Sequence, residues 1–103
     1  MDAQPMSEAM YYILLVLLSP GHGYGLMQRI RELSGERVLM GPGTLYGVLT
    51  RMKKEGLIRL DTLEDRRKVY LLTEEGKRAL KGEYERLKRM VQDGSMLEQE
   101  EEA

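Results

Sequence analysis

Apolar residues recur at helical spacing along four stretches of this 103-residue chain: 8–18, 24–33, 42–55 and 73–94. Spacings of three and four residues place these side chains on one face of a helix. Between residues 57 and 72 apolar and polar residues alternate instead, which predicts a β-hairpin with a polar tip. Three helices, a hairpin and a last helix follow the order of a winged helix-turn-helix. We therefore predict a mostly α fold with a small β-hairpin.

The third predicted helix has a defined start and a defined end. Pro42 suits the first helical position, Gly41 can cap it, and Gly56 can take the left-handed conformation that ends a helix. The outward positions carry hydroxyls, an aromatic ring and cations, with no acid before Glu55, and such a face suits a polyanion. We predict that this recognition helix contacts DNA through Thr44, Tyr46, Gly47, Thr50, Arg51, Lys53 and Lys54.

A second group of cations lies at the hairpin tip and on the returning strand, and we predict that this wing also binds DNA: Arg66, Arg67, Lys68 and Tyr70. We expect the wing to contact phosphates, while Thr44 and Tyr46 in the first turn of the recognition helix approach base edges. A dimer would then read a near-palindromic operator, with half-site centres one or two helical turns apart at about 34 Å per turn.

The net charge of −1 hides an uneven distribution along the chain. Residues 93–103 hold five acidic and no basic side chains, which leaves a net charge of +4 on residues 1–92. Residues 44–71, which include the recognition helix and the hairpin, hold seven basic and four acidic side chains. Because local charge decides what a surface attracts, this segment favours a nucleic acid as its partner.

The first and last helices carry more apolar surface than one small core can use. The first helix is apolar on nearly every side, and the last has apolar residues at four-three-four spacing, a short heptad-like seam. Many chains of this size complete a thin core by association. We predict a homodimer whose interface contains Tyr11, Leu15, Leu18, Leu80, Tyr84, Leu87 and Val91.

These patterns divide the chain into three parts. Residues 1–76 are the predicted winged helix-turn-helix domain and residues 77–94 the dimerisation helix. Residues 95–103 form an acidic tail that we expect to be disordered or only marginally helical. No apolar run approaches the roughly 20 residues that a transmembrane helix needs, and the first residues lack the basic start of a signal peptide. We expect a cytoplasmic protein without a membrane partner.

Four ordered blocks of the sequence resemble the PadR-like transcriptional regulators: Leu14–Leu18 with Gly21–Gly25, Pro42–Tyr46, Glu55–Ile58 and Arg66–Gly76. They span roughly residues 10–80, and four blocks in order are more specific than any one of them. The resemblance implies a dimeric repressor that binds operator DNA and is released by a small hydrophobic or phenolic effector. It also implies the subfamily with a single C-terminal dimerisation helix. Between the subunits, an effector pocket is predicted near Tyr11, Tyr12 and Tyr84.

Two other classes of function are open to a chain of this kind. The first is a winged-helix module that binds protein, which would show no salt-dependent affinity for duplex DNA; the basic segment 44–71 argues against it. The second is an enzyme, but the chain has no cysteine, one histidine, no phosphate-binding loop and no carboxylate pair in apolar surroundings. We therefore predict no catalytic residue, no cofactor and no metal site, and a structural hydrogen-bonding role for His22.

Overall fold

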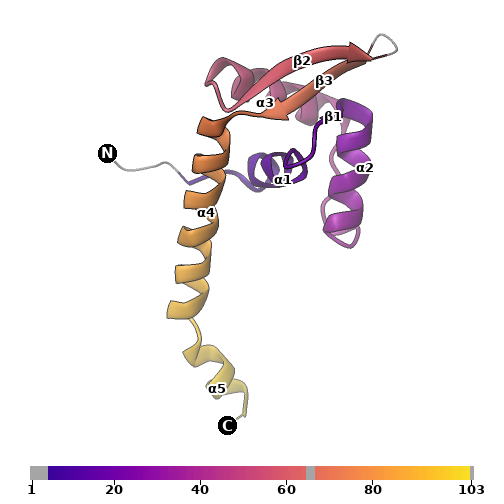
Figure 1. Cartoon of the computed structure of the whole chain (residues 1–103). Coiled ribbons are helices and arrows are strands. Elements are labelled where there is room, and N and C mark those ends of the chain that lie inside the picture. Colours follow the sequence, from indigo (N-terminus) through magenta and orange to yellow (C-terminus); the bar gives the residue numbers. More distant parts are fainter. Residues whose placement is uncertain (1–4, 65–66, 103) are drawn as a thin grey trace.

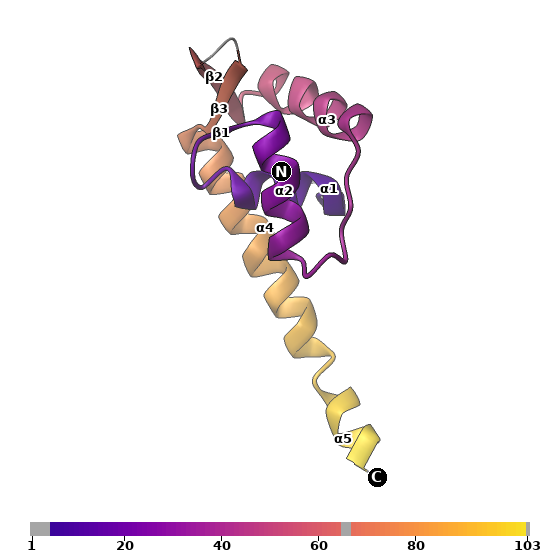
Figure 2. The same cartoon turned by 90° about the vertical axis from the view of Figure 1, so that its right-hand side faces the viewer.

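The computed structural model describes residues 5–64 and 67–102 and confirms the predicted fold (Figure 1). Its elements in chain order are α1 (Glu8–Val16), β1 (Gly21–His22), α2 (Gly23–Leu33), α3 (Pro42–Lys54), β2 (Ile58–Glu64), β3 (Arg67–Leu72), α4 (Glu74–Asp93) and α5 (Met96–Glu102). The three strands form one antiparallel sheet in the order β1-β3-β2. α3 and the β2–β3 hairpin lie at one end of the molecule, and α4 and α5 lead away from them (Figures 1 and 2).

The core lies where the apolar faces of α1, α2 and α3 meet. Spacing of four residues places Leu26 and Ile30 on one face of α2, and Leu45 and Leu49 on one face of α3. The sheet adds Ile58, and the most deeply buried side chains are Ile13, Leu14, Leu17, Leu26, Ile30, Leu45, Leu49, Met52 and Ile58. The helices α1 and α2 and the edge strand β2 thus hold α3 by its inner face and leave its outer face open.

The first helix is two residues shorter than predicted. Ser7 caps it, because its Oγ accepts the N–H of Met10 at 3.1 Å. The helix ends at Val16, and Leu18 lies in the following turn. Arg29 of α2 donates to the carbonyl of Val16 at 3.2 Å and to two carbonyls of that turn at 2.9 and 3.0 Å. These bonds satisfy carbonyls at and after the end of α1, where no helical N–H is available.

The strand β1 lies between the first two predicted helices, in a segment where the sequence pattern predicts no strand. Gly21 pairs with Tyr70 of β3, and His22 pairs with Val69. A strand of two residues is too short to show an alternating pattern, so the sequence could not reveal it. The pairing places the first residue of α2, Gly23, directly beside β3, and this position becomes part of the functional surface.

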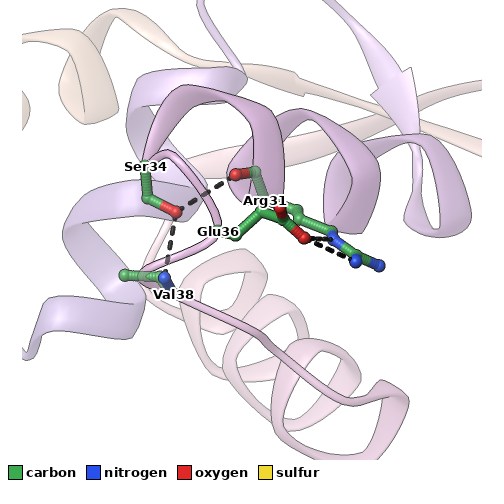
Figure 3. Close-up of polar contacts among 4 residues, drawn as sticks. All are labelled: Arg31, Ser34, Glu36 and Val38. Carbon is green, nitrogen blue, oxygen red and sulfur yellow. Dashed lines mark hydrogen bonds and ion pairs between the residues drawn. The ribbon is translucent and has the colours of Figure 1, made fainter.

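The loop from α2 to α3 turns at two residues with positive φ, Gly35 at 61° and Glu36 at 63°. Figure 3 shows the contacts of this loop. Ser34 Oγ donates to the carbonyl of Arg31 at 3.3 Å and accepts the N–H of Val38 at 3.0 Å, and Arg31 pairs with Glu36 at 2.7 Å. Because left-handed backbone disfavours a glutamate, the ion pair and the Ser34 bonds hold a strained residue in place.

The start of α4 is fixed tightly to the end of α3 and the start of the hairpin. The Thr73 N–H donates to the Leu57 carbonyl at 3.0 Å, and its hydroxyl donates to the Gly56 carbonyl at 2.7 Å. The same hydroxyl accepts the N–H of Gly76 at 3.0 Å, which caps α4 as predicted. A Cβ on Gly76 would lie 2.0 Å from the Leu57 carbonyl oxygen, so only glycine allows this approach.

The far half of α4 and all of α5 project beyond the core (Figure 2). Gly94 ends α4, and α5 continues after a short break. The acidic tail, expected to be disordered or marginally helical, is therefore helical over Met96–Glu102 in this structure. Several large apolar side chains on these two helices stay exposed: Tyr84, Met90, Val91, Met96 and Leu97.

Candidate nucleic-acid interface

The outer face of α3 presents most of the predicted DNA contacts to solvent. Leu45, Leu49 and Met52 fix the inner face in the core. The opposite positions are exposed, as the spacing predicted: Thr44, Gly47, Thr50, Lys53 and Lys54. Gly47 has no neighbouring atom within 4 Å of where a Cβ would stand. A helix face with short side chains near its middle lets another surface approach the backbone closely.

A cleft of about 540 Å³ opens beside this face, where α3, β3 and the first turn of α2 meet. It is lined by His22, Gly23, Tyr24, Tyr46, Thr50, Arg67, Lys68 and Tyr70. The first residues of α2, Gly23 and Tyr24, line this cleft, and the N-terminus of a helix favours anions. Arg67 and Lys68 of β3 and the first residue of α2, Gly23, thus line the same cleft.

Tyr46 leans into the cleft and lies against α2. A Cβ on Gly23 would stand 2.2 Å from the Tyr46 hydroxyl oxygen, so the ring occupies the space that a side chain at Gly23 would need. Thr50 donates its hydroxyl to the Tyr46 carbonyl at 2.8 Å, within the helix. Tyr46 therefore forms a wall of the cleft instead of extending outward from the first turn of α3.

On the β3 side of the cleft, the Arg67 guanidinium lies near the only histidine. Arg67 Nη1 stands 3.5 Å from His22 Nε2. His22 Nδ1 is buried and has no hydrogen-bond partner among the described residues. The pairing of β1 with β3 brings these residues together, and the sequence had no pattern that could predict it. The predicted contact Arg66 lies outside the described residues.

The sequence pattern of the Transcriptional regulator PadR-like family matches residues 13–82, more than half of the chain. The chain belongs to the PadR-like family. The family is one of transcriptional regulators, which supports the predicted DNA-binding regulator over the enzyme alternative.

Solved structures of PadR-like proteins agree with this fold. A PadR-like transcription factor from Bacteroides fragilis has a TM-score of 0.74 at 28% identity, over 85% of this chain and 87% of that chain. Bacillus subtilis PadR, solved in complex with operator DNA, has a TM-score of 0.67 at 27% identity, over 77% of this chain and 47% of that chain. A curated relative, an uncharacterized 37.1 kDa protein in transposon TN4556 of Streptomyces fradiae, is 33% identical over 85 residues. This PadR-like chain spans 24% of that relative's length.

Besides Tyr46, two of the predicted DNA contacts of this PadR-like chain are placed differently from the expectation. Tyr70 is only 7% exposed, packs in the core and reaches the surface only where it lines the cleft, so its role as a DNA contact stays a prediction. Burial raises the pKa of its hydroxyl, with a smaller effect from the nearby Tyr46. Arg51 pairs with Glu55 at 3.0 Å and lines a different groove, shared with α4. Its charge is partly neutralised there and lies on another flank of α3.

The residues predicted for the dimer interface of this PadR-like chain separate into three groups by burial, and Tyr11, Leu15 and Leu87 are half-buried. Leu80 is 5% exposed and belongs to the core of its own subunit, so its predicted place in the interface is wrong. Leu18, Tyr84 and Val91 are exposed, and Val91 is the most open at 74%. The heptad-like seam did not include three other exposed apolar residues of α4 and α5: Met90, Met96 and Leu97.

The three tyrosines predicted to line an effector pocket have separate surroundings. Tyr12 accepts a hydrogen bond from Arg37 at 2.5 Å, and the Arg37 guanidinium also stands 5.7 Å from its ring centre. Tyr11 meets Tyr12 edge to face at 6.1 Å between ring centres, and burial, followed by the nearby Tyr84, raises the pKa of its hydroxyl. None of the three tyrosines lines the cleft beside α3 or the groove that α3 shares with α4. The pocket between subunits stays a prediction.

The described part of the chain holds neither a membrane-spanning helix nor a cluster of metal ligands. Over residues 5–64 and 67–102, no helix is long and apolar enough to cross a membrane. Within the same ranges, no group of three histidine, cysteine, aspartate or glutamate side chains is placed to hold a metal ion. The cleft beside α3 therefore stands out by its cations and hydroxyls.

Proposed function

We propose that this PadR-like regulator is a homodimeric repressor that binds a near-palindromic operator. In this arrangement α3 enters the major groove, and the β2–β3 hairpin lies along the adjacent backbone or minor groove. The observation that carries the proposal is the cleft in which Arg67, Lys68 and the N-terminus of α2 converge next to the exposed face of α3. Such an arrangement suits a polyanion held beside a reading helix.

We assign the cleft to a DNA phosphate. Backbone N–H groups at a helix N-terminus bind phosphate oxygens, and arginine adds a charge-assisted hydrogen bond. Gly23 contributes no side chain to block the first turn of α2, and the Tyr46 ring closes one side. A phosphate held here would fix the position of α3 along the duplex.

Base reading then falls to the exposed residues of α3 that do not line this cleft. Thr44 and Gly47 lie on the open face, and Lys53 and Lys54 extend the cationic surface toward the end of the helix. Base contacts set sequence choice, whereas phosphate contacts give affinity and its salt dependence. The two kinds of contact therefore predict different effects of mutation.

The dimer is proposed from the apolar surface that one subunit leaves open. Tyr84 and Val91 on α4, with Leu18 after α1, are exposed in a chain whose core is already closed. Burying them against a second copy gains about 25 cal/mol for each Å² of apolar surface. Two copies would carry two α3 helices, which is the reason for a near-palindromic operator.

Repression follows if the bound dimer blocks transcription, and we propose that a small hydrophobic effector releases it. Bacillus subtilis PadR has been solved on operator DNA, which supports operator binding as the shared activity. An effector that changes the spacing of the two α3 helices would lower operator affinity, and such coupling is typically about 1–3 kcal/mol. We propose that the regulator acts in the cytoplasm, where its duplex target lies.

Selection of bound sequences from a random duplex pool tests this function. We expect an enriched near-palindrome and tighter binding to it than to a scrambled duplex of the same length. A protein-binding winged helix would enrich no sequence and would show no salt-dependent affinity for duplex DNA. That result would replace the proposal by the alternative.

A further inference from the structure

His22 lies between two hollows of the surface. On one side it lines the cleft beside α3, together with Arg67 and Lys68. On the other side it lines a second hollow of about 390 Å³, together with Arg29 and Asp61. The backbone of His22 is fixed at this boundary because β1 pairs with β3 at this residue. The imidazole ring is thus held where a ligand of the cleft beside α3 would reach it.

The buried ring nitrogen of His22 faces the first turn of α2. His22 is the N-cap residue of this helix, and its Nδ1 is buried without a hydrogen-bond partner among the described residues. A Cβ on Gly25, in the first turn, would stand 3.6 Å from Nδ1. The start of a helix presents N–H donors and the positive end of the helix dipole, so it favours an acceptor at Nδ1. Because a neutral imidazole carries one N–H, we assign its proton to Nε2.

The outer ring nitrogen of His22 lies beside a second donor. Arg67 Nη1 stands 3.5 Å from His22 Nε2. This separation exceeds the roughly 2.7–3.2 Å that is usual for N–H···O hydrogen bonds. A guanidinium has only donors, so with the proton on Nε2 these two groups cannot bond to each other. One oxygen atom at about 2.9 Å from each nitrogen can instead accept from both, so Nε2 and Nη1 are arranged as a pair of donors for a single oxygen.

The positive charge that attracts an anion here comes from side chains other than His22. Arg67 and Lys68 line the cleft, whereas Arg29 lines the second hollow and already donates to three backbone carbonyls. Asp61 is the one acid among the described residues that line the two hollows. Three tyrosines complete the surroundings: Tyr24, Tyr46 and Tyr70. A neutral imidazole in this place adds a directed N–H without adding charge.

We propose that His22 is a ligand of the DNA phosphate in the cleft beside α3, with its neutral Nε2–H and Arg67 donating to the same phosphate oxygen. This inference rests on the proposed function and adds a residue to it. Hydrogen bonds to a charged partner are stronger than those between neutral groups, and a ring held by both β1 and α2 loses little freedom on binding. His22 therefore contributes affinity but, because it is uncharged, releases no counterion and leaves the salt dependence to the cations.

Matched variants of His22 test the proposal through the binding of the full chain to a selected operator and to a scrambled duplex, measured by fluorescence anisotropy at several salt concentrations. In His22→Gln the side-chain amide reaches the position of Nε2, whereas in His22→Asn it reaches that of Nδ1. We expect His22→Asn and His22→Ala to bind both duplexes about tenfold more weakly, as for loss of one bond to a charged group, with the log–log salt slope unchanged. We expect His22→Gln to keep most of the affinity.

Equal binding by His22→Gln and His22→Asn would overturn the proposal. So would a salt slope that His22→Ala lowers by about 1, because that change would show a charged imidazole. The variant Arg67→Ala separates this inference from the proposed function. If Arg67→Ala lowers the salt slope while the His22 variants bind alike, the cleft holds a phosphate without His22. If Arg67→Ala leaves the slope unchanged, the assignment of the cleft to a phosphate itself fails.

Nitrogen-15 NMR of the unaltered chain gives a test that does not depend on how well a variant folds. The chain has one histidine, so labelling of histidine reports on His22 alone. The chemical shifts of the two ring nitrogens show which of them carries a proton. We expect the proton on Nε2, and none on Nδ1, in the operator complex at pH 7. A ring protonated at Nδ1 alone, or at both nitrogens, would overturn the proposal.

Discussion

The change Glu83→Gln measures how much a buried ion pair contributes to this fold, and Glu75→Gln is its matched control. Both glutamates lie on α4 and pair with an arginine three residues later, at 2.6 Å for Glu83–Arg86 and 2.7 Å for Glu75–Arg78. The first carboxylate is 6% exposed and the second 61%. The same chemical change at the same helical spacing thus differs mainly in burial.

The expected magnitude follows from the bonds that are lost. Glutamine keeps one acceptor oxygen but turns an NH₂ group toward the Arg86 guanidinium, so at least one charge-assisted bond is lost, worth about 1.5–3 kcal/mol. Breaking a fully buried pair costs about 3–5 kcal/mol, but Arg86 is 36% exposed and can turn toward water. We expect Glu83→Gln to lower the free energy of unfolding by about 2 kcal/mol. Glu75→Gln should cost less than about 0.5 kcal/mol.

Urea unfolding at one fixed protein concentration checks these expected losses of stability, because association adds a concentration-dependent term to stability.

The pH dependence of stability supplies a second test. Hydrogen bonds from Arg86 hold the pKa of Glu83 below its ordinary value of 4.5, although burial opposes them. The stability that this pair contributes is therefore present above pH 4.5 and is lost as the pH falls through the lower folded value. If Glu83→Gln costs no more than Glu75→Gln at pH 7, the reasoning is refuted.

Three further predictions concern the backbone and the dimer. Gly76→Ala should destabilise by about 3 kcal/mol, because its Cβ would stand 2.0 Å from the Leu57 carbonyl oxygen, whereas Gly82→Ala on the same helix should stabilise; urea unfolding of both decides. Glu36→Gly should be about 1 kcal/mol more stable than Glu36→Ala, since only glycine accepts φ of 63° without strain, and equal midpoints would contradict this. Val91→Glu should shift sedimentation toward the monomer, and an unchanged dimer would show that this flank of α4 is not the interface.

The helices and the hairpin could be predicted because each has its own periodicity and its own end signals. Ser7, Thr73 and Gly56 mark helix ends through local backbone chemistry, which depends on neighbours in sequence. The end of α1 was misplaced because Arg29, thirteen residues later, caps it. β1 was missed because a strand of two residues is too short to show a periodic pattern. The end of α1 and the position of β1 both depend on contacts between segments that are distant in the sequence.

The sequence predicted which face of α3 is exposed, but not what each flank of that helix contacts. Periodicity separates inner from outer positions of α3, but it cannot tell which neighbour each flank meets. Tyr46 meets Gly23, and Arg51 meets α4, because of how α2 and α4 pack around α3. Glu83 had no pattern that marked it as buried, since glutamate on a helix is usually exposed.

The central claim is that the cleft beside α3 holds a DNA phosphate, and salt-dependent titration tests it most directly. Binding of wild type and Arg67→Ala to a selected operator and to a scrambled duplex would be measured by fluorescence anisotropy at several salt concentrations, with Arg89→Ala on α4 as control. We predict that Arg67→Ala weakens both duplexes alike and lowers the log–log salt slope by about 1, the loss expected for one phosphate contact. Arg89→Ala should leave both unchanged. If Arg67→Ala leaves the slope unchanged, or alters sequence preference without altering the slope, no phosphate is bound in this cleft.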